Sequence, residues 1–373
     1  MGTLRICLAG GGSGGHLYPC IATAQAIERR CSHAQLLLIG ARRAADRARL
    51  AKHHWPYRLV SARALPYGNV ARRLLNLAWL AWSQLEAVPI LRRFRPDVLV
   101  ATGGYVSAGV VPAARVLRIP VVLHESDAVP GRTTRLLARH AAAITVGFQE
   151  ALQVLPSEKT HFVGQPIRSD VLAPARDAGR EMLGLSAHAH TLLVTGGSYG
   201  ARSLNEATVD ALPELLSNGA IQVLHVAGEA DHPRTAESVS RRGIESSLYH
   251  LVPYLDDMGH ALAVADLVLC RAGANTMAEV AARRIPAVVV PYPHAAAHQE
   301  ANTRPFVDAG AAIMVPDAEL SGERLAALVR TLLGDEQRRQ RMAEAAEALS
   351  QPNAADAIAD IAISLARHRS SRP

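Results

Sequence analysis

The chain has 373 residues, 49% of them hydrophobic and 20% charged, with a formal net charge of +7 at pH 7. This length predicts two domains, and the composition excludes general disorder because such a chain can bury a substantial core. No apolar stretch reaches the roughly 20 residues of a membrane-spanning helix, and the N-terminal one is too short for a signal peptide. We therefore expect a protein that stays in the cytoplasm.

The cysteines and the basic residues exclude further classes. The four cysteines form no CxxC pair, which predicts reduced thiols that hold neither a disulfide nor a metal. The positive charge comes almost entirely from scattered arginines with few aromatic residues among them, so a nucleic-acid partner is not expected. A mildly basic surface fits an acidic ligand or an anionic lipid surface.

The first part of the chain alternates short apolar runs with helical patterns. Arg5–Ala9 is predicted as a strand, Gly10–Gly15 as a glycine loop and Pro19–Arg30 as a helix. The further strands predicted here are Gln35–Ile39, Pro96–Ala101, Val121–His124 and Ala143–Val146. Alternation of this kind, with glycines at the carboxyl ends of strands, predicts a doubly wound parallel sheet.

The same pattern then restarts. His190–Thr195 is predicted as a strand, Gly196–Gly200 as a second glycine loop and Leu204–Leu216 as a helix. The strands predicted after them are Gln222–Ala227, Leu267–Cys270 and Ala287–Pro291. We therefore expect an α/β protein of two Rossmann-like, doubly wound domains facing a cleft, with domains at 1–163 and 164–349. A last helix at about 353–367 is expected to pack back on the first domain.

The first glycine loop contains five glycines and ends in His16. No acidic residue ends the second predicted strand, which argues against a dinucleotide site, and no Gly-Lys-Ser/Thr follows, which excludes a P-loop. Glycines allow a ligand to approach the backbone closely, so a binding loop is favoured over a plain turn. His16 could be a catalytic base or could cap the following helix.

The stretch Gly273–Glu279 follows a predicted strand and opens a helix. The amides of Ala274–Met277 could therefore hold a diphosphate, because the N-terminus of a helix binds anions. Glu279 could accept hydrogen bonds from ribose hydroxyls, or it could merely compensate the helix dipole. His294 and His298 have the spacing of a metal pair, but no third ligand accompanies them, so neither a metal nor another cofactor is expected.

Eight motifs in this order resemble those of the MurG family of bacterial cell-wall N-acetylglucosaminyltransferases. The matching stretches are Gly10–His16, Thr102–Ser107, His124-Glu125 with Ala128–Gly131, Gly164–Arg168, Gly196–Arg202, Asp256–Met258, Gly273–Glu279 and Pro291–Asn302. The resemblance runs from Leu4 to about Ile363. It implies the glycosyltransferase B fold and transfer of N-acetylglucosamine from its UDP derivative to an undecaprenyl-diphospho-muramoyl-pentapeptide. It also implies work at the cytoplasmic face of the inner membrane, on an anionic surface and in the company of other cell-wall synthesis proteins.

The resemblance implies a site for the UDP-sugar donor, held mainly by the second domain. The donor contacts that it implies are Ser13, Gly14, Gly15, Asp127, Arg168, Ser198, Leu255, Ala274, Asn275, Thr276, Met277, Glu279, Gln299 and Asn302. Within this set, the resemblance gives Leu255 to the uracil, Glu279 to the ribose, and Gln299 with Asn302 to the sugar hydroxyls. The chain departs from the family at Ser13, where threonine is usual, at Ser126-Asp127, where Gln-Asn is usual, and at Asn275, where leucine is usual.

For the acceptor, the resemblance implies contacts at His16, Tyr105, His124 and Glu125. The acceptor's 4-hydroxyl would attack C1 of the sugar from the face opposite UDP, so the configuration inverts. Helix-terminus amides and Arg168 would stabilise the leaving diphosphate without a metal. A base must take the hydroxyl proton, and His16 is the first candidate and Glu125 the second.

A helix bearing two of the three tryptophans is predicted within 72–82. Leu75, Trp79 and Trp82 share one face of it, and two arginines stand at its start. Such a face is either core or a membrane-interface surface. For the whole chain, three other functions remain open. They are a glycolipid synthase that uses diacylglycerol, a UDP-N-acetylglucosamine epimerase of the same fold, and a nucleotide-sugar binder without activity.

Overall fold

The computed structural model describes residues 3–63, 70–197, 200–293 and 298–370, with only the backbone given for 70–76 and 370. The chain divides into two compact units. The first comprises Met1–Arg168 together with Gln351–Pro373, and the second comprises Ser169–Ser350. The boundary between them falls after Arg168, five residues beyond the end of the predicted first domain at 163.

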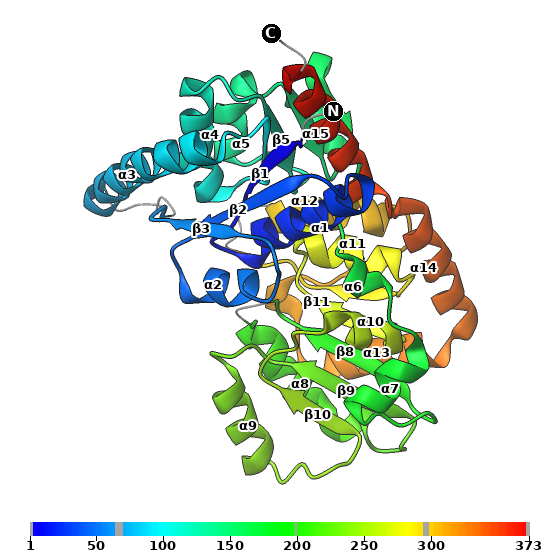
Figure 1. The fold of residues 1–373 in the computed structure, drawn as a ribbon. Helices are drawn as coiled ribbons and strands as arrows, with labels where there is room; N and C mark the ends of the chain where they lie inside the picture. The colour runs from blue at the N-terminus through cyan, green and yellow to red at the C-terminus, as the bar shows by residue number, and fades with distance from the viewer. Residues whose placement is uncertain (1–2, 64–69, 198–199, 294–297, 371–373) are drawn as a thin grey trace. The chain divides into compact units, whose positions relative to one another are not determined.

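The first unit is built on a seven-stranded parallel sheet in the order β3-β2-β1-β4-β5-β6-β7 (Figure 1). Its strands are β1 (Arg5–Ala9), β2 (Gln35–Ala41), β3 (Tyr57–Val60), β4 (Val98–Ala101), β5 (Val121–Glu125), β6 (Ala143–Val146) and β7 (Thr160–Phe162). Its α-helices are α1 (Gly14–Arg30), α2 (Ala44–Leu50), α3 (Val70–Phe94), α4 (Gly104–Val116), α5 (Arg132–Leu137) and α15 (Ala354–Ser370). Short 3₁₀ turns lie at Ala138–His140, Gln149–Gln153 and Ser157–Lys159.

Two apolar layers cover this sheet. One face packs against α1 and α15, where Ile21 and Ala24 share a buried cluster with Ile358 and Ala362. The other face packs against α3, α4 and α5. Arg29 of α1 also pairs with Asp356 of α15 at 3.0 Å, so the last helix of the chain completes the first unit.

The second unit has a six-stranded parallel sheet in the order β10-β9-β8-β11-β12-β13. Its strands are β8 (His190–Thr195), β9 (Ile221–Val226), β10 (Tyr249–Val252), β11 (Leu267–Cys270), β12 (Ala287–Val289) and β13 (Ala312–Met314). Its α-helices are α6 (Ser169–Leu172), α7 (Arg176–Leu183), α8 (Arg202–Leu215), α9 (His232–Arg241), α10 (Met258–Val264), α11 (Ala274–Ala282), α12 (His298–Asp308), α13 (Gly322–Gly334) and α14 (Glu336–Leu349), and a 3₁₀ turn lies at Asp317–Glu319.

The predicted strands are all present, and the four that the pattern does not predict, β3, β7, β10 and β13, are the sheet edges. A central parallel strand is buried on both faces and appears as a continuous apolar run, whereas an edge strand is shorter and more polar. Tyr57–Val60 illustrates this, because only its last residue is buried. The doubly wound parallel fold predicted for each half is confirmed, and it places the glycine loops after β1 and β8, at the carboxyl edge of each sheet.

Candidate functional site

The first glycine loop connects β1 to α1, and two of its glycines are required by packing. A Cβ on Gly12, which has a φ of +86°, would lie 2.0 Å from the ring of Tyr105. A Cβ on Gly10 would lie 2.1 Å from the hydroxyl oxygen of Thr102. The loop therefore packs directly on the segment 102–105 that links β4 to α4, and the half-buried Tyr105 is part of that contact.

Asp46 holds this loop in place, a role that the sequence analysis missed. Its buried carboxylate accepts hydrogen bonds from the amides of Gly12, at 2.7 Å, and Ala41, at 2.9 Å. A buried carboxylate that accepts amide hydrogen bonds fixes the backbone around it. The available signal was an acidic residue shortly after the second strand. Because Asp46 lies inside α2, the sequence does not show that its side chain points towards the glycine loop.

The remaining residues of the loop open α1. Ser13 precedes the first helical residue and makes no side-chain capping bond, while Gly14 is buried and Gly15 is exposed. A Cβ on Gly15 would meet nothing closer than the Ser13 hydroxyl oxygen at 3.6 Å. Packing of the described residues therefore does not require a glycine here, in contrast to Gly10 and Gly12.

The His16 side chain is held by the residues that follow β4, Thr102 to Gly104. Its Nδ1 donates to the carbonyl oxygen of Thr102 at 3.0 Å, and Gly103 and Gly104, both with positive φ, pass along the ring. A Cβ on Gly104 would lie 2.6 Å from the His16 ring. Because Nδ1 carries the proton in the neutral ring, Nε2 is the acceptor nitrogen, as a general base needs.

His124 lies at the end of β5 and is fully buried. Its Nε2 donates to the side-chain oxygen of Gln165 at 2.9 Å, and its Nδ1 accepts from the hydroxyl of Thr145 at 3.1 Å. Burial, together with the nearby His16, lowers the pKa of His124 to about 4 against the opposing effect of the Gln165 bond, so the ring is neutral at pH 7. The structure therefore places this side chain inside the first unit rather than at the surface that an acceptor contact needs.

Glu125 follows and is also buried. One carboxylate oxygen accepts from the Asp127 amide and the other from the Gly131 amide, both at 3.0 Å. Burial and the neighbouring Asp127 raise the pKa of Glu125, while the hydrogen bonds oppose that rise. With both oxygens bonded to the backbone, Glu125 shapes the loop 126–131, and Asp127 lies half-buried on that loop. Glu125 is thus less available as a base than His16.

Arg168 is the last residue of the first unit before the boundary. Its guanidinium lies 4.3 Å from the centre of the Tyr18 ring, which belongs to α1. The predicted domain bounds place Arg168 in the second domain, at 164–349. In the structure its cation–π contact is with the helix that follows the first glycine loop.

Two of the predicted donor residues of the second unit, Ser198 and Leu255, precede α11 in the chain. Ser198, in the loop after β8, lies outside the described residues. Leu255 is half-buried in the segment between β10 and α10. Gly200, two residues after Ser198 in the chain, has a φ of +78°. A Cβ on Gly200 would lie 2.2 Å from the carbonyl oxygen of Ala227, so this glycine too is required by packing.

The start of α11 is the candidate phosphate site. Gly273 precedes the helix, and the first helical hydrogen bond runs from the Met277 amide to the Gly273 carbonyl at 3.0 Å. The amides of Ala274, Asn275 and Thr276 precede that bond, so they form the positive end of the helix. The Met277 side chain is fully buried and its amide is bonded, so Met277 supports the helix rather than offering a donor.

Glu279 and Gln299 both remain partly exposed. Glu279 lies four residues after Asn275 on α11, so these two side chains lie on the same face of the helix. Gln299, in the first turn of α12, accepts from the Tyr292 amide at 2.9 Å through its side-chain oxygen. The side-chain oxygen of Gln299 thus fixes the residues after β12.

Asn302 is fully buried, and its side-chain amide donates to the carbonyl oxygen of Ala272 at 3.2 Å. This bond joins α12 to the residue just ahead of the Gly273 turn. The structure therefore places the Asn302 side chain beneath the candidate phosphate site, where it supports the turn, and not at the surface where a sugar hydroxyl could reach it.

Arg271 is a further positioning residue that the sequence analysis missed. The buried guanidinium pairs with Asp317 at 2.6 Å, donates to the carbonyls of Val290 and Pro291, and donates to the Ser203 hydroxyl at 2.8 Å. It connects the carboxyl ends of β11 and β12 ahead of α11. The available signal was an arginine placed directly between a buried strand and the Gly273 turn.

The tryptophan-bearing helix is α3. Trp82 is 54% exposed and Leu85, three residues on, is 65% exposed, whereas Trp79 is half-buried beneath the guanidinium of Arg63 at 4.5 Å. Leu75 lies on the same helix, in the part for which only the backbone is described. Trp82 and Leu85 are thus not core residues. No described helix is long and apolar enough to cross a membrane.

Among the residues that the structure describes, no group of three or more His, Cys, Asp or Glu side chains could hold a metal ion. His294, the first member of the predicted pair with His298, lies outside those residues. The cysteines are unpaired, and Cys7, Cys20 and Cys270 are buried. Burial raises the pKa of each of these three thiols, to about 12 for Cys270, so none is poised as a nucleophile.

Two family models and many relatives match this chain. The N-terminal domain of glycosyltransferase family 28 matches residues 6–146, and its C-terminal domain matches residues 191–360. A relative from Moorella thermoacetica is 39% identical over 96% of this chain and 98% of its own length. Another, from Halothermothrix orenii, is 34% identical over 96% and 98%. Both are called UDP-N-acetylglucosamine--N-acetylmuramyl-(pentapeptide) pyrophosphoryl-undecaprenol N-acetylglucosamine transferase.

Solved structures give the same result. The crystal structure of MurG from Acinetobacter baumannii aligns with a TM-score of 0.72 and 27% identity, covering 97% of this chain and all of that one. An anthocyanidin 3-O-glucosyltransferase aligns with a TM-score of 0.70 but 12% identity, over 98% and 99%, which shows the fold alone.

Two doubly wound units, each with a glycine loop at the carboxyl edge of its sheet, define a glycosyltransferase of the two-domain B fold. Two of the eight motifs that suggested the family, Gly10–His16 and Gly196–Arg202, begin in these loops. The chain belongs to glycosyltransferase family 28, with the transferases that these relatives represent.

Proposed function

We propose that this enzyme transfers N-acetylglucosamine from UDP-N-acetylglucosamine to the 4-hydroxyl of an undecaprenyl-diphospho-muramoyl-pentapeptide, a step of peptidoglycan synthesis. The observation that carries this proposal is the 39% identity, over nearly the whole chain, to a transferase named for that reaction. The protein would act as a peripheral protein on the anionic cytoplasmic face of the inner membrane, where it could meet other cell-wall synthesis proteins.

The second unit is proposed to hold the donor. The amides of Ala274, Asn275 and Thr276 at the start of α11 suit a diphosphate, and Glu279 on the same helix face suits ribose hydroxyls. Gln299 retains a side-chain NH₂ group for the sugar, while Leu255 would meet the uracil. Asn302, Met277 and Arg271 would act beneath the site, through the position of the α11 turn.

The first unit is proposed to hold the acceptor and the base. With Nδ1 donating to the Thr102 carbonyl, His16 presents Nε2 to accept the proton of the attacking hydroxyl. The hydroxyl oxygen forms the new bond to C1 as the bond to the UDP oxygen breaks, so the configuration inverts. Ser13, Gly14, Gly15 and Asp127 are further proposed donor contacts, and the buried His124 and Glu125 would keep the surrounding loops in place.

The departing UDP gains negative charge. We propose that the α11 amides and the Arg168 guanidinium stabilise this charge, with Ser198 as a further donor contact, so that the reaction proceeds without a metal. Amides fixed at a helix start need no reorganisation when the charge develops, which suits them to this task.

Incubation of the enzyme with radiolabelled UDP-N-acetylglucosamine and the lipid-linked acceptor tests the proposal. We expect label in the lipid fraction, a β-linkage by NMR, and unchanged turnover with excess chelator. Transfer to diacylglycerol instead, or release of N-acetylmannosamine without an acceptor, would identify a glycolipid synthase or an epimerase. Donor binding with no chemistry on any acceptor would identify a binding protein.

A further inference from the structure

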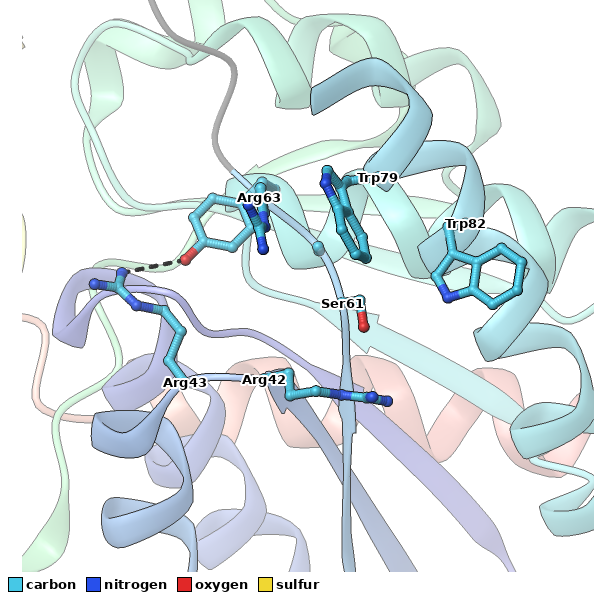
Figure 2. A pocket seen from close by; sticks show the side chains of 8 residues that line it. Arg42, Arg43, Ser61, Arg63, Trp79 and Trp82 are labelled. Atoms are coloured by element: carbon cyan, nitrogen blue, oxygen red, sulfur yellow. Dashed lines mark hydrogen bonds between the residues drawn. The ribbon is translucent and has the colours of Figure 1, made fainter. Parts of the chain in front are cut away.

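A cavity of about 870 Å³ opens in the first unit beside the first glycine loop. Side chains from the ends of β2 and β3 and from α3 and α4 line it (Figure 2). The lining residues are Arg42, Arg43, Ser61, Ala62, Arg63, Trp79, Trp82 and Tyr105. We refer to it as the arginine–tryptophan pocket. None of the proposed donor contacts that the structure describes is among these lining residues.

The arginines give the pocket its charge. Arg42 pairs with Glu86 at 2.9 Å, and Glu86 also accepts from the amide and hydroxyl of Ser61, so this charge is balanced inside the unit. Arg63 has no carboxylate partner among the described residues, and the central carbon of its guanidinium lies 4.5 Å from the centre of the Trp79 ring, a cation–π contact. This contact engages the charge of the guanidinium with the ring, so its N–H groups can still donate to an anion.

Arg43 connects the pocket to the glycine loop. It donates to the carbonyl oxygen of Gly12 at 2.6 Å and to the Tyr105 hydroxyl at 3.4 Å, the bond drawn in Figure 2. Gly12 is four residues before His16 in the same loop. An anion bound beside Arg43 would therefore lie next to the segment that carries the proposed base.

The other wall of the pocket is apolar and continues onto the surface. Trp79 and Trp82 lie on one side of α3, as Figure 2 shows, and Leu85 continues the exposed apolar face one turn beyond Trp82. A ligand that suits both walls has an anionic group attached to an apolar chain. A nucleotide sugar supplies the anion but no such chain, whereas a polyprenyl diphosphate supplies both.

We propose that the arginine–tryptophan pocket binds the diphosphate and the first prenyl units of the lipid-linked acceptor. Arg43 and Arg63 hold the diphosphate, and the chain leaves over Trp79, Trp82 and Leu85. The proposal rests on the proposed function for the identity of the acceptor, and it adds the residues that recognise its lipid end. It makes the affinity for the acceptor depend on the lipid diphosphate as well as on the sugar.

Binding of farnesyl diphosphate, followed by tryptophan fluorescence, tests the pocket without catalysis. Two of the three tryptophans line the pocket, and the third, Trp55, is buried elsewhere in the first unit. We expect farnesyl diphosphate to change the fluorescence and to bind about tenfold or more tighter than either inorganic diphosphate or farnesol. Arg63→Gln and Arg43→Gln should each weaken its binding about tenfold.

Matched variants keep this test decisive. Arg58→Gln removes an exposed arginine of β3 outside the pocket and should bind farnesyl diphosphate as the parent does. Because Arg43 also supports the Gly12 carbonyl, melting temperatures are compared, and Arg63→Gln, which removes no such bond, carries the conclusion. In the transfer assay, Arg63→Gln should raise the KM for the lipid-linked acceptor about tenfold and leave the KM for UDP-N-acetylglucosamine unchanged.

Two results would overturn the proposal. One is unchanged farnesyl diphosphate affinity in Arg63→Gln. The other is a loss of binding to phosphatidylglycerol vesicles in both Arg63→Gln and Arg43→Gln while their affinity for farnesyl diphosphate stays that of the parent. That result would make the pocket a phospholipid headgroup site. If the parent protein transfers no sugar, the proposed function fails, but the farnesyl diphosphate measurements still decide whether this pocket holds a prenyl diphosphate.

Discussion

The Nδ1 of His16 donates to the carbonyl oxygen of Thr102 across 3.0 Å. This bond joins the first glycine loop to the segment after β4 and leaves Nε2 as the basic nitrogen of the neutral ring. The orientation of a side chain proposed to act in catalysis is thus set by a backbone atom 86 residues away in the chain.

Replacing His16 by alanine should lower kcat by roughly 10²–10⁴-fold while the KM for UDP-N-acetylglucosamine changes little, because a positioned base acts on the rate. Steady-state kinetics with the lipid-linked acceptor measure this. His33→Ala, at an exposed histidine in the loop before β2, is the control and should behave as the parent does. A change confined to KM would recast His16 as a binding residue.

Glu279→Ala should weaken the binding of UDP-N-acetylglucosamine about ten- to a hundredfold. The reason is the loss of charge-assisted hydrogen bonds to the ribose, worth about 1.5–3 kcal/mol together. Isothermal titration calorimetry gives the Kd directly. Glu245→Ala, at an exposed glutamate of the same unit, should leave the Kd unchanged. Equal affinities for parent and Glu279→Ala would exclude the ribose role and leave dipole compensation.

Two glycines of one loop should respond differently to alanine. Gly12→Ala places a methyl group 2.0 Å from the Tyr105 ring at a φ of +86°, so it should lower the melting temperature sharply. Gly15→Ala meets only the Ser13 hydroxyl oxygen at 3.6 Å, so the melting temperature should stay within about 2 °C and only turnover should fall. Calorimetry measures the loss of stability from disturbed packing, and the transfer assay measures the loss of turnover from a hindered approach of the donor. Full activity in Gly15→Ala would remove this residue from the donor contacts.

The double variant Trp82→Ser/Leu85→Ser should remain folded, because both side chains are more than half exposed. It should lose affinity for anionic vesicles, while its kcat with a short-chain, water-soluble acceptor at saturating concentration stays near that of the parent. Cosedimentation with phosphatidylglycerol vesicles measures this. Leu136→Ser, at a leucine of α5 that is 61% exposed, is the matched control. Unchanged vesicle binding in the double variant would move the membrane contact away from α3.

Stability should fall as the pH is lowered from about 6.5 towards 4. Burial lowers the pKa of His124 to about 4 and that of His225, in β9, to about 3, so the unfolded chain takes up protons that the folded chain does not. The contribution of each neutral ring to the free energy of unfolding is fully present above pH 6.5. It is lost as the pH falls from there towards the pKa of that ring in the folded protein. For His124 it amounts to roughly 3 kcal/mol.

Calorimetry of the parent and of His124→Gln and His225→Gln across this pH range tests the effect. Each variant should be less stable at pH 7.5 but lose less stability on acidification than the parent. His33→Gln, at an exposed histidine, should follow the parent curve. Parallel pH profiles for all four proteins would show that other groups control the acid transition.

The central strands, the glycine loops and the start of α11 could be predicted from the sequence alone. Each depends on a local pattern, since a buried parallel strand is a continuous apolar run and glycines mark the turn at its carboxyl end. The edge strands could not, because each has only three or four residues and three of them, Tyr57–Val60, Thr160–Phe162 and Tyr249–Val252, contain polar residues. The family could be recognised because its motifs are short local stretches, three of which begin in the glycine loops and at the start of α11.

The direction of each side chain was decided by the tertiary structure. His124 and Glu125 follow one another at the end of β5 in a motif that suggested surface contacts, yet both are buried because Gln165 and the loop 126–131 close over them. Asp46, Arg43, Arg63 and Trp79 show the converse. Their spacing in the sequence carries no signal, yet the fold brings Asp46 and Arg43 to Gly12 of the first glycine loop and Arg63 over the ring of Trp79. Burial and partnership depend on contacts between distant segments, which no local pattern encodes.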